Sequence, residues 1–132
     1  MITLLRLEEA AQFLLILLVL VMKGVAWWVY LLLLIGPDIG MVGYLLNTRV
    51  GAFTYNLTHH KGIAILLILA GIGAEMGNML TNVQSGLLLA GLVLFGHSAL
   101  DRMLGYGLKF GDSFQHTHLG WIGKPTGQEH AQ

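Results

Sequence analysis

The chain has 132 residues, of which 55% are hydrophobic and only 11% are charged, and its formal net charge is zero. Soluble domains carry about 25% charged residues, so this composition is typical of a membrane protein. The scattered basic residues exclude a nucleic-acid surface, and the lack of cysteine excludes disulfides, thiolate ligands and cysteine nucleophiles.

The first apolar segment covers residues 3–22 and ends at Lys23-Gly24. A transmembrane helix needs about 20 mostly apolar residues, which this segment supplies. Glu8 and Glu9 stand where a signal peptide has a basic region, and no small-residue cleavage site follows. We therefore expect a retained spanning helix.

Three further apolar segments follow, at residues 25–46, 50–74 and 85–104, and Gly36-Pro37-Asp38 interrupts the first of them. Short connections make neighbouring helices antiparallel, and the 18 glycines allow close helix approach. Residues 105–132 form a polar, Gly-rich tail. The prediction is one all-α domain over residues 1–132, a four-helix transmembrane bundle in the lipid bilayer.

The basic residues predict the orientation of this bundle. One side has Lys23 and the loop 75–84, which contains no Lys or Arg. The other side collects Arg6, Arg49, Arg102, Lys109 and Lys124. The positive-inside rule then predicts a multi-pass protein of the cell membrane with both termini cytoplasmic.

Ionisable residues from three helices are predicted to meet at one depth. At a 1.5 Å rise per residue, Asp38 and His59 lie roughly 15 Å from the cytoplasmic turn, and His97 about 12 Å. Asp101 is one turn beyond His97 and shares its helix face. Ionisable groups in hydrocarbon are costly and indicate a function. These four residues predict a mixed nitrogen and oxygen site suited to Zn²⁺ or Fe²⁺.

Nearby residues extend this site. Pro37 removes a helical hydrogen bond and should free a carbonyl close to it. Asn56 precedes His59 by three residues and could orient its ring, and Glu9 lies in the cytoplasmic half of the first helix. Simpler interpretations stay open: Asp38 as a helix cap, His59 at an interface, and Asp101-Arg102 as an interfacial ion pair.

Several motifs resemble the domain-of-unknown-function 4260 family, and together they cover nearly the whole chain. They are Leu5-Arg6-Leu7-Glu8-Glu9, Pro37-Asp38, Gly43-Tyr44-Leu45-Leu46-Asn47, Arg49-Val50-Gly51, Tyr55-Asn56-Leu57-Thr58-His59, the stretch from His97 through Tyr106 to Lys109, and Phe114-Gln115-His116-Thr117-His118-Leu119-Gly120. The resemblance implies a small multi-pass bacterial membrane protein and no particular activity. Where the family has Lys-Asp before its Thr-His-Leu-Gly motif, this chain has Gln115-His116.

A more distant similarity is to membrane-bound metal-dependent hydrolases, which also carry a Pro-Asp motif and a His-x-x-x-Asp motif followed by Gly. The chain departs from them in having one acid after Pro37 and no histidine shortly behind it.

Three functional hypotheses follow. The first is a metal-dependent hydrolase of a lipid or other amphiphile, with His118 as acid–base catalyst. Alternatively, His118 binds a head group. The residues expected to support the metal ligands or to contact the substrate are Glu9, Asn56, Arg49, Arg102, Tyr106 and Lys109. The second hypothesis is a proton-coupled transporter or proton relay, for which four helices would require a homodimer. The third is a bis-histidine haem carrier or a structural subunit of a membrane complex.

Overall fold

The computed structural model describes residues 1–77 and 81–123, without the side chains of 81–85. This part of the chain is mostly helical, which confirms the all-α prediction. The helices are α1 (Ile2–Met22), α2 (Trp27–Ile35), the 3-10 helix η1 (Pro37–Leu45), α3 (Thr48–His59), α4 (Lys61–Met76) and α5 (Thr81–Leu104). Two short strands, β1 (His116–Thr117) and β2 (Gly120–Trp121), form an antiparallel hairpin within the segment predicted as a polar tail.

Two of the predicted membrane helices are broken, the first of them at the interruption that Gly36-Pro37-Asp38 predicts. The segment predicted over 25–46 divides at Gly36 into α2 and η1, and the one predicted over 50–74 divides at His60 into α3 and α4. Each pair is bent by 41° at its break. Pro37 causes the first break because it has no backbone N–H to donate. At the second, His60 adopts an extended conformation with ψ of 109°.

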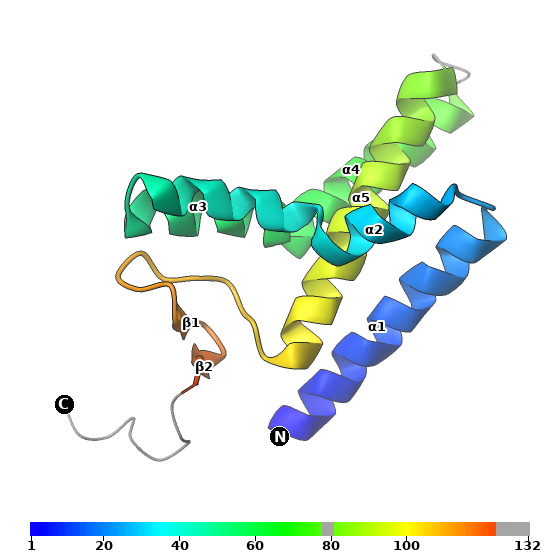
Figure 1. Ribbon diagram of the computed structural model, residues 1–132. Coiled ribbons are helices and arrows are strands. Elements are labelled where there is room, and N and C mark those ends of the chain that lie inside the picture. The colour runs from blue at the N-terminus through cyan, green and yellow to red at the C-terminus, as the bar shows by residue number, and fades with distance from the viewer. Residues whose placement is uncertain (78–80, 124–132) are drawn as a thin grey trace.

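Figure 1 shows how the elements are arranged. Helices α1, α2, α4 and α5 lie together, and α3 projects to one side with η1 packed against it. The apolar core joins α1, α2 and α5 and includes Ile16, Leu20, Val29, Leu33 and Leu92. The β-hairpin lies beside α3, so the segment that follows α5 folds back on the helices.

Glycines permit the closest helix contacts, as the sequence predicts. A Cβ added at Gly40 of η1 would lie 2.5 Å from Thr58 Oγ1 and 2.7 Å from the Thr54 carbonyl oxygen, both in α3. A Cβ at Gly91 of α5 would lie 2.7 Å from the Ala64 carbonyl oxygen of α4. Both helix pairs are therefore packed backbone against backbone.

In the described part of the chain, one helical stretch, Gly86–Leu104, is long and apolar enough to cross a membrane. The number rises to three if each bent pair is one crossing. Helix α1 has 21 residues but carries Arg6, Glu8 and Glu9 near its start. The structure thus supports membrane association, and the four-helix transmembrane bundle stays a prediction.

Candidate metal centre

Asp38, His59, His97 and Asp101, the Asp/His quartet, come together where the helices break. Asp38 is in the first turn of η1 and His59 is the last residue of α3, while the other two lie one turn apart in α5. One potential ligand atom from each lies within 4.8 Å of all the others. Both helix breaks adjoin the quartet, so the irregular backbone lies beside the clustered ionisable side chains.

The four distances between histidine nitrogens and carboxylate oxygens in the quartet are close to the spacing of ligands around one metal ion. His59 Nε2 lies 3.6 Å from Asp38 Oδ1 and 3.3 Å from Asp101 Oδ2. His97 Nε2 lies 3.4 Å from Asp38 Oδ1 and 3.8 Å from Asp101 Oδ1. Ligands at Zn–N and Zn–O distances in a tetrahedron are about 3.4 Å apart. Histidine–carboxylate hydrogen bonds are shorter, as in the 2.7 Å contact between His116 Nδ1 and Asp112 Oδ2 in this chain.

Both quartet histidines direct Nε2 at the carboxylates. His97 Nδ1 is 2.9 Å from the Leu33 carbonyl oxygen, and His59 Nδ1 is 2.8 Å from that of Tyr55. Donation from Nδ1–H to these carbonyls leaves the Nε2 lone pairs free for a metal. Both Nε2 atoms are buried and have no hydrogen-bond partner among the described residues. A cation between the two imidazoles and the two carboxylates would satisfy them.

The Leu33 carbonyl is the one that Pro37 frees. In a continuous helix it would accept from the N–H of residue 37, which proline lacks. His97 Nδ1 takes that place across the α2–α5 interface. The expectation that Pro37 releases a carbonyl near the site is therefore confirmed, and this carbonyl orients a ligand.

Tyr55 supports two members of the quartet. Its hydroxyl donates to Asp101 Oδ2 at 2.5 Å, and its ring stacks on His59 with centroids 3.7 Å apart. Ser98 donates to the His59 carbonyl oxygen at 2.8 Å and so ties the end of α3 to α5. Sequence reasoning assigned neither residue a role, although Tyr55 is one turn from His59 and must share its helix face.

Asp38 differs from its three partners. Its side chain is 35% exposed, against 15% for Asp101 and 1–3% for the two histidines. No hydrogen bond within the described residues orients its carboxylate, whereas His59, His97 and Asp101 each have an orienting partner. The quartet is therefore three side chains with an orienting partner and one partly exposed carboxylate without one among the described residues.

Lys109 lies beside the quartet in an aromatic cage. Its Nζ is 4.0 Å from the ring centroid of Phe114, 5.0 Å from that of Tyr55 and 5.8 Å from that of Tyr106. Burial lowers the pKa of Lys109, and the charges of two nearby carboxylates, Asp101 and Asp38, act in the opposite direction. Lys109 thus lies close enough to the quartet for the charges of Asp101 and Asp38 to act on it.

Asn56 contacts the backbone of Lys109 and not the ring of His59. Its Nδ2 donates to the Lys109 carbonyl oxygen at 2.8 Å, and its Oδ1 accepts from the Lys109 N–H at 2.7 Å. The predicted role of orienting His59 belongs to the Tyr55 carbonyl instead. Asn56 therefore fixes the segment after α5 against α3.

The remaining predicted residues lie elsewhere. Glu9 binds Lys61 through Oε2, and its Oε1 is 3.9 Å from an Arg102 guanidinium nitrogen. His118 lines a separate pocket with Glu9 and Arg102, and Arg49 is exposed and approaches Gly111. In the part of the chain that the structure describes, no hydrogen bond or ion pair joins these residues to the quartet.

The quartet also bears on the haem hypothesis. The rings of His59 and His97 have centroids 4.9 Å apart and are inclined at 68°. Axial ligands bind from opposite sides of a haem, and these rings leave no space for a porphyrin between them. A small cation fits this geometry and a bis-histidine haem does not.

Comparison with known proteins gives a family but no relative with a known activity. No curated protein and no solved structure matches the chain. A family model described as "Domain of unknown function (DUF4260)" matches residues 2–122, which include the whole quartet and the hairpin. The resemblance seen in the sequence motifs is thereby confirmed, and the chain belongs to the DUF4260 family.

Proposed function

We propose that the Asp/His quartet binds a divalent metal ion and that the protein is a metal-dependent membrane hydrolase. The observation that carries metal binding is the pair of buried, unpartnered Nε2 atoms facing two carboxylates at 3.3–3.8 Å. Two imidazoles and two carboxylates suit Zn²⁺ or Fe²⁺. Direct proton transfer between the same groups is favoured by shorter, charge-assisted hydrogen bonds.

Asp38 favours a catalytic site over a purely structural one. Structural zinc sites have four fixed protein ligands, and catalytic ones have three plus an open position. His59, His97 and Asp101 form the fixed set of two histidines and one carboxylate. Asp38 is the most exposed member and has no orienting bond among the described residues, so it would be the carboxylate to accept a proton from water.

The reaction is then the hydrolysis of an ester. A divalent ion lowers the pKa of a water molecule toward neutrality and so supplies the nucleophile. Asp38 accepts the proton of this water, whose oxygen bonds to the ester carbon or phosphorus. The bond to the alcohol breaks, and the alcohol leaves with the proton. Lys109 is placed to attract the anionic part of such a substrate.

A membrane setting indicates an amphiphilic substrate. We propose that the chain is multi-pass, with both described ends on the cytoplasmic side. Arg6 of α1 approaches Gly105 and Arg49 of α3 approaches Gly111, so basic residues from two helices lie near the segment that follows α5. Single cysteines introduced at Gln115 and Glu75 in this cysteine-free chain should be labelled from opposite sides of intact cells. Labelling of both from the same side would overturn this orientation.

Turnover of short-chain lipid esters tests the hydrolase assignment. The purified protein loaded with Zn²⁺ or Fe²⁺ should hydrolyse a carboxylic or phosphoric ester, and EDTA should stop it. Asp38→Asn should keep the metal and lose turnover. Asp112→Asn, which removes an exposed carboxylate of the tail, is the matched control and should retain both. Equal turnover by the Asp38 and Asp112 variants, or turnover in EDTA, would contradict the assignment.

A further inference from the structure

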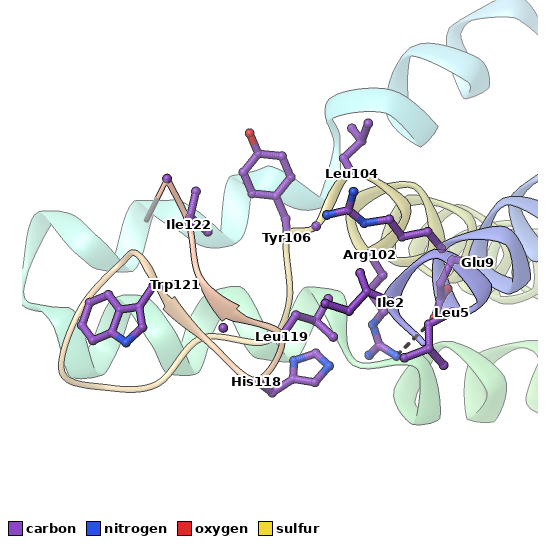
Figure 2. Close-up of a pocket in the computed structure, with 14 residues that line it drawn as sticks. Ile2, Leu5, Glu9, Arg102, Leu104, Tyr106, His118, Leu119, Trp121 and Ile122 are labelled. Atoms are coloured by element: carbon purple, nitrogen blue, oxygen red, sulfur yellow. Dashed lines mark ion pairs between the residues drawn. The ribbon is translucent and has the colours of Figure 1, made fainter. Parts of the chain in front are cut away.

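A second site lies at the end of the molecule where α1 starts and α5 ends. A cavity of about 590 Å³ opens between these helix ends and the tail hairpin. Figure 2 shows Ile2, Leu5 and Glu9 of α1 on one side and His118, Leu119 and Ile122 of the tail on the other. The cavity combines apolar walls with a small group of charged side chains.

Positive charge is in excess in this cavity. Arg6 and Arg102 both line it, and Glu9 is the carboxylate there. Glu9 interacts with two cations: one carboxylate oxygen binds Lys61, and the other lies 3.9 Å from the Arg102 guanidinium. Arg6 is exposed and has no ion pair or hydrogen bond within the described residues, although its guanidinium reaches to Gly105. One guanidinium is thus free to bind an anion, and a second lines the same cavity.

His118 adds a hydrogen-bond donor to the same cavity. Its Nδ1 accepts the Leu108 N–H at 2.8 Å, which leaves the proton on Nε2. Burial and the charge of Arg102 lower the pKa of His118, so that the ring is neutral at neutral pH. Neutral Nε2–H remains available to an acceptor oxygen.

We propose that this cavity binds the phosphate head group of an anionic amphiphile. Two guanidiniums and an imidazole N–H are hydrogen-bond donors for the oxygens of a phosphate monoester. Each guanidinium can bind a phosphate through two parallel hydrogen bonds. Ile2, Leu5 and Leu104 offer apolar surface to an adjoining acyl chain. This site is separate from the quartet, since Arg102 belongs to the cavity and its neighbour Asp101 to the metal centre.

Native mass spectrometry of the full chain in detergent tests the proposal. Dioleoyl phosphatidic acid should bind more tightly than dioleoyl phosphatidylcholine, which has the same chains and no net charge. Arg6→Gln should weaken phosphatidic acid binding by about tenfold, the loss of one charge-assisted hydrogen-bond partner. Arg49→Gln, the matched control, removes an exposed positive charge outside the cavity and should leave the affinity unchanged.

Other outcomes overturn the proposal. Equal affinity for the two lipids, or equal loss in the Arg6 and Arg49 variants, would show unspecific adsorption. Displacement of the lipid by inorganic phosphate at the same concentration would show a site for a soluble anion. Affinity for phosphatidic acid that disappears in EDTA would place the lipid at the metal centre, whereas the proposal predicts no change on metal removal.

Discussion

Replacing Tyr55 by Phe removes one hydroxyl next to the metal centre and keeps the ring that stacks on His59. The lost bond is the 2.5 Å donation to Asp101 Oδ2. Hydrogen bonds to charged groups contribute about 1.5–3 kcal/mol. Loss of an outer-shell partner typically costs about 10–100-fold in metal affinity, which corresponds to roughly 1.4–2.8 kcal/mol. The two magnitudes agree, so Tyr55→Phe should weaken metal binding by one to two orders of magnitude.

Competition for Zn²⁺ against a chromophoric chelator measures this change directly. Tyr44→Phe is the matched control, because the Tyr44 hydroxyl is buried without a hydrogen-bond partner among the described residues. It should keep the affinity of the unmodified protein. Unchanged Zn²⁺ affinity in Tyr55→Phe, or an equal loss in both variants, would refute the view that Tyr55 acts through Asp101.

Three further predictions test the architecture around the site. Gly40→Ala should lower the free energy of unfolding by about 1–3 kcal/mol, because the new Cβ overpacks against α3. Gly73→Ala is the control, since nothing lies within 4 Å of its new Cβ, and it should leave the free energy of unfolding unchanged. Thermal melts of the two variants measure the difference. Pro37→Ala restores an N–H that competes for the Leu33 carbonyl, so chelator competition should show weaker Zn²⁺ binding, and unchanged affinity would contradict the role of that carbonyl. The pKa of His118 is lowered in the folded state, so the folded protein binds fewer protons there than the unfolded chain. Stability should therefore fall as pH drops below the ordinary histidine value of about 6.5, and His118→Gln should show a shallower fall in pH-dependent melts.

The meeting of the quartet could be predicted because helices impose a fixed rise. Counting residues from the cytoplasmic ends of the helices placed Asp38, His59 and His97 at similar depths, and Pro37 predicted a free carbonyl. Both inferences depend only on local geometry. The structure adds the identity of the acceptor, the Leu33 carbonyl, and of its donor, His97.

The second helix break could not be predicted in the same way. The break at His60 contains no proline; instead, a long-range contact replaces the helical hydrogen bond to the His59 carbonyl oxygen. Ile63 N–H bonds to the His60 carbonyl oxygen, which leaves the His59 carbonyl oxygen to accept from Ser98, 39 residues away. A sequence pattern within the third segment contains no sign of this partner in α5.

The folded segment after α5 was missed for a related reason. Gly-rich polar sequence is typical of a solvated tail, yet the two bonds between Asn56 and Lys109 span 53 residues. Those bonds hold the chain against α3, and the hairpin that follows lines the cavity proposed to bind a phosphate. That Arg6, Arg102 and His118 line one cavity therefore follows only from the tertiary structure.

Metal content of the purified protein tests the central claim most directly. Mass spectrometric elemental analysis after gentle detergent extraction and reconstitution with Zn²⁺ or Fe²⁺ should find about one ion per chain. His97→Ala should lose it and stay folded, while His116→Ala, which changes a tail histidine paired with Asp112, should retain it. An unmodified protein that takes up no metal, or a His97→Ala variant with full stoichiometric metal, would contradict the assignment of the quartet as a metal centre.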